Sequence, residues 1–160
     1  MKAKGFALIE LIVVIGMLAI LLGFMTINIF GVQKRTVVTG TVDTLVADFR
    51  SQQTKAMTGV TSGGSTTPTS YGIWFASDRY ILFQGTSYNP NATTNSVIIL
   101  DPSVTFGSIS LPNSSVIFAT TSGEIVGYNA QLNSVTLSQT DVNMSRTIHV
   151  NQYGVITAVN

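Results

Sequence analysis

The stretch KGFALIELIVVIGMLAILLGF, residues 4–24, decides the fold expected for the first part of this chain. It holds one carboxylate, Glu10, and no other charged residue occurs between residues 6 and 33. A helix needs about 20 apolar residues to cross a bilayer. The sequence therefore predicts a transmembrane helix over residues 6–33, in which a charge near the start requires a partner or a function.

Two simpler interpretations of this segment fit the residues less well. A cleaved secretory signal peptide has an apolar stretch of about 7–15 residues, followed by a small-x-small cleavage site. The stretch here is longer, and FMTINIFGVQKR, residues 24–35, lacks such a site. A plain single-span anchor leaves the carboxylate of Glu10 without any role.

Beyond the apolar run, residues 34–58 show the pattern of an amphipathic helix. One face is formed by residues at spacings of three or four, and the charged residues lie elsewhere. The members of this face are Val38, Val42, Leu45, Phe49, Gln53 and Ala56. We expect one continuous helix that ends at Gly59 or at the later pair Gly63 and Gly64.

The remaining residues, 59–160, change in character after a linker rich in Gly, Ser and Thr. Short segments with β-branched and aromatic residues alternate with turn residues, which predicts a largely antiparallel β head. These segments are YGIWF, RYILFQG, SVIIL, VTFGSISL, SSVIFAT, EIVGY, SVTLSQ, RTIHVN and GVITAV. Hairpin turns are expected at residues 76–78 and 121–123. The predicted fold class is therefore α+β, with a long N-terminal helix packed on a β head.

The head has few residues that suggest catalysis. The chain has no cysteine and one histidine, His149, which we expect to be exposed on a polar strand face. Asp101 and Glu124 have no acidic neighbour in the sequence, and no hydrolase, phosphate-loop or metal-ligand motif occurs. Trp74 is interpreted as sheet core. We expect neither enzyme activity nor a cofactor or metal.

The segment Lys4-Gly5-Phe6-Ala7-Leu8-Ile9-Glu10, followed by a long apolar helix, resembles the N-terminus of type IV pilins and pseudopilins. The match combines a short basic leader, Gly then Phe at a junction, Glu four residues later, and the apolar run. The head, with RYILF, SSVIFATTSGEIVG and RTIHVNQYGVITAV, is similar in pattern to the H-type pseudopilins of type II secretion. The resemblance implies a pilin-like fold.

The resemblance also implies how residues 1–10 would be processed. A prepilin peptidase would cut between Gly5 and Phe6, remove the leader at residues 1–5 and N-methylate Phe6. The new amine of Phe6 and the carboxylate of Glu10 from neighbouring subunits would then pair during assembly. The implied partners are prepilin peptidase, other pilin or pseudopilin subunits and an inner-membrane assembly platform, with the membrane holding the chain before assembly. The implied location is a single-pass inner membrane with a cytoplasmic N-terminus, followed by an extracytoplasmic filament.

Three functions remain open at this point. The leading one is a structural subunit of a type IV pilus or a pseudopilus, in which the helices of residues 6–33 form the filament core. The second is a minor pilin that binds DNA, which the charge of the head disfavours. From residue 59 onward two cations face four acids, a net charge of −2, and these residues are Arg79, Arg146, Asp78, Asp101, Glu124 and Asp141. The third is a single-span surface adhesin or binding protein.

Overall fold

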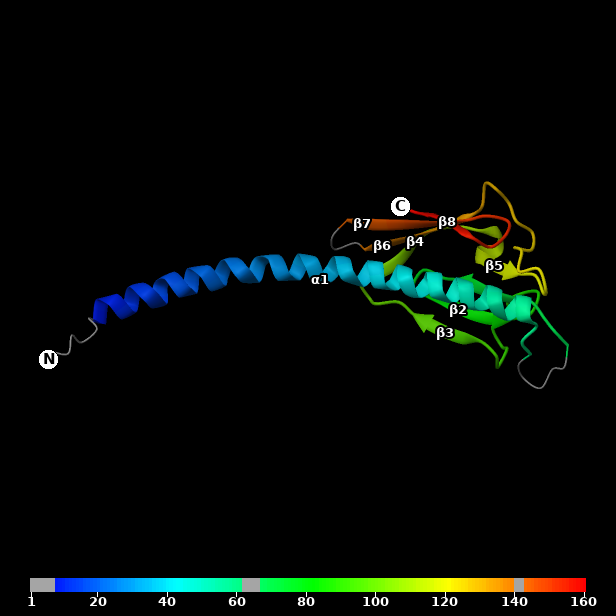
Figure 1. The fold of residues 1–160 in the computed structure, drawn as a ribbon, viewed down its shortest axis with the longest axis horizontal. Coiled ribbons are helices and arrows are strands. Elements are labelled where there is room, and N and C mark those ends of the chain that lie inside the picture. Colours follow the sequence, from blue (N-terminus) through cyan, green and yellow to red (C-terminus); the bar gives the residue numbers. More distant parts are fainter. Residues whose placement is uncertain (1–7, 62–66, 140–142) are drawn as a thin grey trace. The chain divides into compact units, whose positions relative to one another are not determined.

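The computed structural model describes residues 8–61, 67–139 and 143–160. Their helices are α1 (Leu8–Thr58) and the 3₁₀ helix η1 (Pro112–Ser114). Their strands are β1 (Tyr71–Phe75), β2 (Arg79–Gln84), β3 (Ser96–Ile99), β4 (Val104–Ser110), β5 (Ser115–Phe118), β6 (Ser134–Gln139), β7 (Met144–Val150) and β8 (Ile156–Val159). Figure 1 shows their arrangement, with colours that follow the sequence from the N-terminus to the C-terminus.

The chain divides into two compact units, residues 1–36 and residues 37–160. Helix α1 contributes to both. In the first unit its described side chains, at residues 8–23, are all exposed. In the second unit α1 joins eight strands around one hydrophobic core.

The predicted fold class and location are corrected in one respect, the membrane-spanning helix over residues 6–33. A bilayer crossing requires about 20 consecutive apolar residues within one helix. Within the described ranges, no helix combines the length and the apolar character that this requires. The predicted single-pass membrane location is wrong on the same finding.

Helix α1 ends at Thr58 because of the glycine that follows it. Gly59 has a φ of +66°, the left-handed conformation that glycine adopts without steric cost. This turn lets the amide of Val60 donate to the carbonyl oxygen of Lys55 at 3.1 Å, which satisfies an otherwise open helix carbonyl. Of the two predicted ends, the earlier glycine is the one used.

The part of α1 in the second unit buries one side, as the spacing predicted. Val38, Leu45 and Ala56 have no exposed surface, and Phe49 is nearly buried. The prediction was wrong at one position, because Gln52 is buried and Gln53 is only half-buried. Both lie within one turn of Phe49, at spacings of three and four, and a helix presents both spacings on the same face.

The eight strands form two four-stranded antiparallel sheets, with strand orders β3-β2-β1-β5 and β4-β6-β7-β8. The expected hairpin at residues 76–78 joins β1 to β2, where Phe75 pairs with Tyr80. Eight of the nine predicted segments contain a strand. The ninth, EIVGY, makes only one isolated bridge, between Ile125 and Phe118.

The core of the second unit lies where α1 meets the sheets, and Figure 1 shows this part of the helix alongside β2, β6 and β7. The ring of Phe49 contacts the rings of Phe75 and Phe118, with centroids 6.2 and 6.1 Å away. Leu137 and Ile148 from the other sheet belong to the same cluster. Burial of an aromatic or aliphatic side chain of this size contributes about 1.5–3 kcal/mol.

Candidate functional site

Of the residues predicted to act in processing and assembly, one lies in the described part of the chain. Gly5 and Phe6, the predicted cleavage and methylation sites, lie outside the described residues. Glu10 lies in the first turn of α1 and is exposed. A carboxylate there interacts favourably with the helix dipole, which contributes about 0.3–1 kcal/mol. The predicted pairing of Glu10 with Phe6 therefore stays a prediction.

Around Glu10, helix α1 carries an apolar surface on all its sides. Eleven large apolar side chains between residues 8 and 21 are each between 47% and 76% exposed. They are Leu8, Ile9, Leu11, Ile12, Val13, Val14, Ile15, Met17, Leu18, Ile20 and Leu21. We call them the apolar helix surface. Because consecutive residues are about 100° apart around a helix, such a run faces every direction.

The chemistry of the apolar helix surface is that of an interface. A helix that is hydrophobic all round is normally buried, and monomeric proteins rarely expose large contiguous apolar patches. Glu10 is the only charged residue within this stretch of the helix, residues 8–21. An unpaired carboxylate among apolar side chains is costly once the surface is covered. Pairing of Glu10 with a cation would lower that cost.

In the second unit, polar contacts fix α1 to two loops of the β head at defined positions. The side-chain amide of Gln53 donates to the carbonyl oxygens of Gly123, at 3.0 Å, and Tyr153, at 2.7 Å. Both acceptors belong to loops, so the helix and the loops hold each other in place. Sequence reasoning assigned Gln53 to the apolar stripe and missed this role.

A second polar contact joins α1 to strand β2. The hydroxyl of Tyr80 donates to a carboxylate oxygen of Asp48 at 2.6 Å. Burial raises the pKa of the Tyr80 hydroxyl well above its ordinary value, and the hydrogen bond to Asp48 and the charge of that carboxylate raise it further. The hydroxyl is therefore a proton donor at neutral pH.

The predicted polar residues of the head do not converge on one site. His149 is half-buried in β7 and lies opposite Ser134 and Ala158 of the neighbouring strands. Asp101 accepts hydrogen bonds from the hydroxyl and amide of Ser103, which lower the pKa of its carboxyl. Within the described residues, no group of three or more histidine, aspartate or glutamate side chains could hold a metal ion.

Trp74 was interpreted as sheet core, and the structure places it differently. It is half-buried outside the main cluster and stacks on Tyr88, with ring centroids 4.7 Å apart and planes 14° apart. Tyr88 lies in the connection between β2 and β3. No local pattern marks it as a partner of Trp74, since fourteen positions separate the two.

The likeness to pilins therefore rests on the N-terminal residues and on the strand pattern of the head. This chain matches no protein-family model, no curated protein and no solved structure.

Proposed function

We propose that this protein is a structural subunit of a type IV pilus or of a type II secretion-like pseudopilus. In this proposal prepilin peptidase processes it at Gly5 and Phe6, and it assembles through its N-terminal helix. The β-rich second unit then forms the outward part of each subunit. The proposal needs no catalytic residue and no cofactor.

The observation that supports this function best is the apolar helix surface. Its eleven exposed large side chains lie in one helix and face all its sides. Covering all sides requires several neighbours, as in a bundle of helices from many copies. The free energy gained is about 25 cal/mol for each Å² of apolar surface removed from water.

Glu10 gives that bundle a register. Apolar contacts alone are non-directional and allow helices to slide along one another. A carboxylate within the apolar helix surface favours the one offset at which a neighbour's Phe6 amine reaches it, because other offsets leave a charge unpaired in apolar surroundings. The proposal therefore assigns different roles to two features of α1. The apolar residues supply affinity, and Glu10 supplies alignment.

The first experiment determines the N-terminus of the chain after co-expression with a prepilin peptidase. Intact-mass and N-terminal sequence measurements are expected to give a mature chain that begins at methylated Phe6. A chain that keeps residues 1–5 in the presence of active peptidase overturns the proposed processing.

The second experiment measures assembly by sedimentation and electron microscopy of filaments. Glu10→Ala is expected to leave processing intact and to reduce the sedimenting fraction at least tenfold. The matched control is Asp43→Ala, which removes another exposed carboxylate from the same helix, in its second-unit part. Equal assembly of the Glu10→Ala and Asp43→Ala variants contradicts the role of Glu10.

A further inference from the structure

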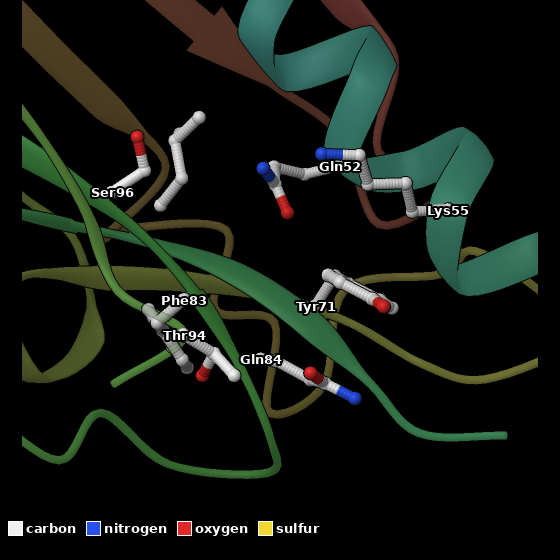
Figure 2. A pocket seen from close by; sticks show the side chains of 8 residues that line it. Gln52, Lys55, Tyr71, Phe83, Gln84, Thr94 and Ser96 are labelled. Carbon is white, nitrogen blue, oxygen red and sulfur yellow. The ribbon is translucent and has the colours of Figure 1, made fainter. Parts of the chain in front are cut away.

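A pocket of about 150 Å³ lies within the second unit, between α1 and the sheet that contains β1 and β2. Figure 2 shows Gln52 and Lys55 reaching into it from the helix, opposite Tyr71 and Phe83 of the strands and Ser96 at the start of β3. The pocket thus has a helix wall with two polar side chains and a strand wall of mixed character. All its described lining residues belong to the second unit, whereas the residues invoked in assembly belong to the first.

Gln52 is the feature that identifies this pocket as a binding site. The residue is 2% exposed, and its side-chain oxygen Oε1 accepts no hydrogen bond. Leaving a buried amide oxygen without a donor costs about 1–3 kcal/mol, and native proteins rarely tolerate it. Figure 2 shows this oxygen directed from α1 toward the strands.

Tyr71, which lines the strand wall of the pocket, does not supply the missing donor. The hydroxyl of Tyr71 donates instead to the carbonyl oxygen of Val60, at 2.8 Å. A donor from a molecule that enters the pocket would satisfy Gln52 Oε1. The first requirement on a ligand is therefore a hydroxyl or amide hydrogen.

The charge of the pocket sets the second requirement. Lys55 is the one charged residue among the described side chains that line it, and no acid is among them. A cationic ligand would face Lys55 without a counter-charge, whereas a monoanion would be attracted to it. The hydroxyl of Ser96 is a further donor suited to an anionic oxygen.

The size of the pocket sets the third requirement. A cavity of about 150 Å³ accommodates a molecule the size of benzene, with about six non-hydrogen atoms. Leu82 and Phe83 supply apolar wall for the carbon atoms of such a molecule. The ligand is thus small, partly apolar and singly negative.

We propose that this pocket binds a small hydroxycarboxylate, with its carboxylate at Lys55 and its hydroxyl donating to Gln52 Oε1. A hydroxy acid with a three-carbon chain has the size, the single negative charge and the donor that the pocket requires. This binding function is independent of assembly through the apolar helix surface.

The test compares two acids on the full chain, which is kept in solution with a nonionic detergent. L-lactate carries the hydroxyl donor, and propionate has the same carbon chain and carboxylate without it. Each acid is titrated to 50 mM into ¹⁵N-labelled protein, and the signals of the Gln52 side-chain amide are followed by NMR. Lactate is expected to bind at least tenfold more tightly than propionate and to shift those signals.

Two variants and a control assign the contacts. Gln52→Met is expected to reduce lactate affinity to that of propionate, and Lys55→Gln to weaken both acids at least fivefold. Arg146→Gln removes an exposed cation from β7 and is expected to change neither affinity. Circular dichroism of each variant verifies folding, and the comparison of acids on the unaltered chain needs no variant.

Three outcomes overturn the proposal. They are equal binding of the two acids to the unaltered chain, no shift of the Gln52 amide signals at 50 mM, and unchanged lactate binding in a folded Gln52→Met variant. The second of these outcomes means that the pocket holds only water.

Discussion

Leu18 and Leu45 belong to the same helix, yet Leu18 is 52% exposed and Leu45 is fully buried. The two leucines have the same chemistry and the same secondary structure. They differ in what the sequence places around them. Near Leu18 almost every residue is apolar, whereas near Leu45 the apolar residues follow one stripe and charged residues occupy the other sides.

This difference shows that hydrophobicity and hydrophobic pattern have separate consequences. A stripe can be covered by one partner on one side, and the strands of the second unit provide it. A helix that is apolar all round cannot be covered by one neighbour. The same helix therefore stabilises the single chain in one part and, in the proposed function, the assembly in the other.

The largest expected effect comes from shortening each of these two leucines. Leu45→Ala is expected to lower the free energy of unfolding of the second unit by about 2–5 kcal/mol, because it leaves a cavity in the core. Leu18→Ala is expected to change the free energy of unfolding by less than about 0.5 kcal/mol, because the side chain of Leu18 is exposed and its removal leaves no cavity in the core. Denaturant titration followed by fluorescence of Trp74, the single tryptophan, measures both.

Equal destabilisation of the second unit by Leu18→Ala and Leu45→Ala would contradict the expected difference between the exposed and the buried leucine. Sedimentation of filaments supplies the reciprocal measurement. There Leu18→Ala is expected to have the larger effect of the two folded variants.

A smaller effect is expected where the C-terminal loop meets α1. Gly154 has a φ of +72°. An added Cβ would lie 2.6 Å from the side-chain nitrogen Nε2 of Gln53 and 2.9 Å from the ring of Phe118. Gly154→Ala is expected to cost about 2–4 kcal/mol, the sum of left-handed strain and weakened hydrogen bonds of Gln53.

Gly127 is the matched control for this substitution. Its φ of +67° is similar, but an added Cβ would meet no atom within 4 Å. Gly127→Ala is expected to cost only the backbone strain, about 1–2 kcal/mol. The same denaturant titration measures both variants. Equal losses in the free energy of unfolding would mean that the contact between residue 154 and Gln53 does not affect stability.

The smallest effect is expected for Tyr80→Phe, which removes the hydrogen bond to Asp48. The expected loss is about 1 kcal/mol at pH 7. The pKa of Tyr80 is raised in the folded chain. The contribution of its hydroxyl to the free energy of unfolding is therefore fully present below the pKa of the unfolded state, about 10, and decreases as the pH rises above that value. Between the pKa of the unfolded state, about 10, and the higher pKa of the folded state, each pH unit costs the unaltered chain about 1.4 kcal/mol relative to the variant.

Unfolding titrations of both proteins at pH 8 and pH 11 test this dependence. The stability difference is expected to shrink or reverse at the higher pH. A difference that stays constant between these two values contradicts the proton linkage, even if the loss at pH 7 is found.

Periodicity predicted the second-unit part of α1 well because a buried stripe depends on local spacing alone. Val38, Val42, Leu45 and Phe49 were placed correctly on that basis. The same reasoning confused Gln52 with Gln53, because spacings of three and four from Phe49 lie on the same helix face and both residues are glutamine. Which of them is buried depends on strands that follow much later in the sequence.

The strand segments were predictable from β-branched and aromatic residues, but their tertiary partners were not. EIVGY has the composition of a strand, yet it forms only the bridge of Ile125 to Phe118. The stacking of Trp74 on Tyr88 and the pocket beside Gln52 both arise from contacts between separate elements. Such contacts have no periodic signature in the sequence.

The hydrogen bonds of Gln53 have a consequence for how the second unit folds. Its two carbonyl partners, Gly123 and Tyr153, follow it by 70 and 100 residues. Contacts over such separations close long loops, which makes folding slow relative to helix formation. During synthesis, α1 is complete well before its last partner emerges. The stripe around Leu45 and Phe49 therefore stays uncovered for most of translation, and a chaperone that shields apolar helices would act in this interval.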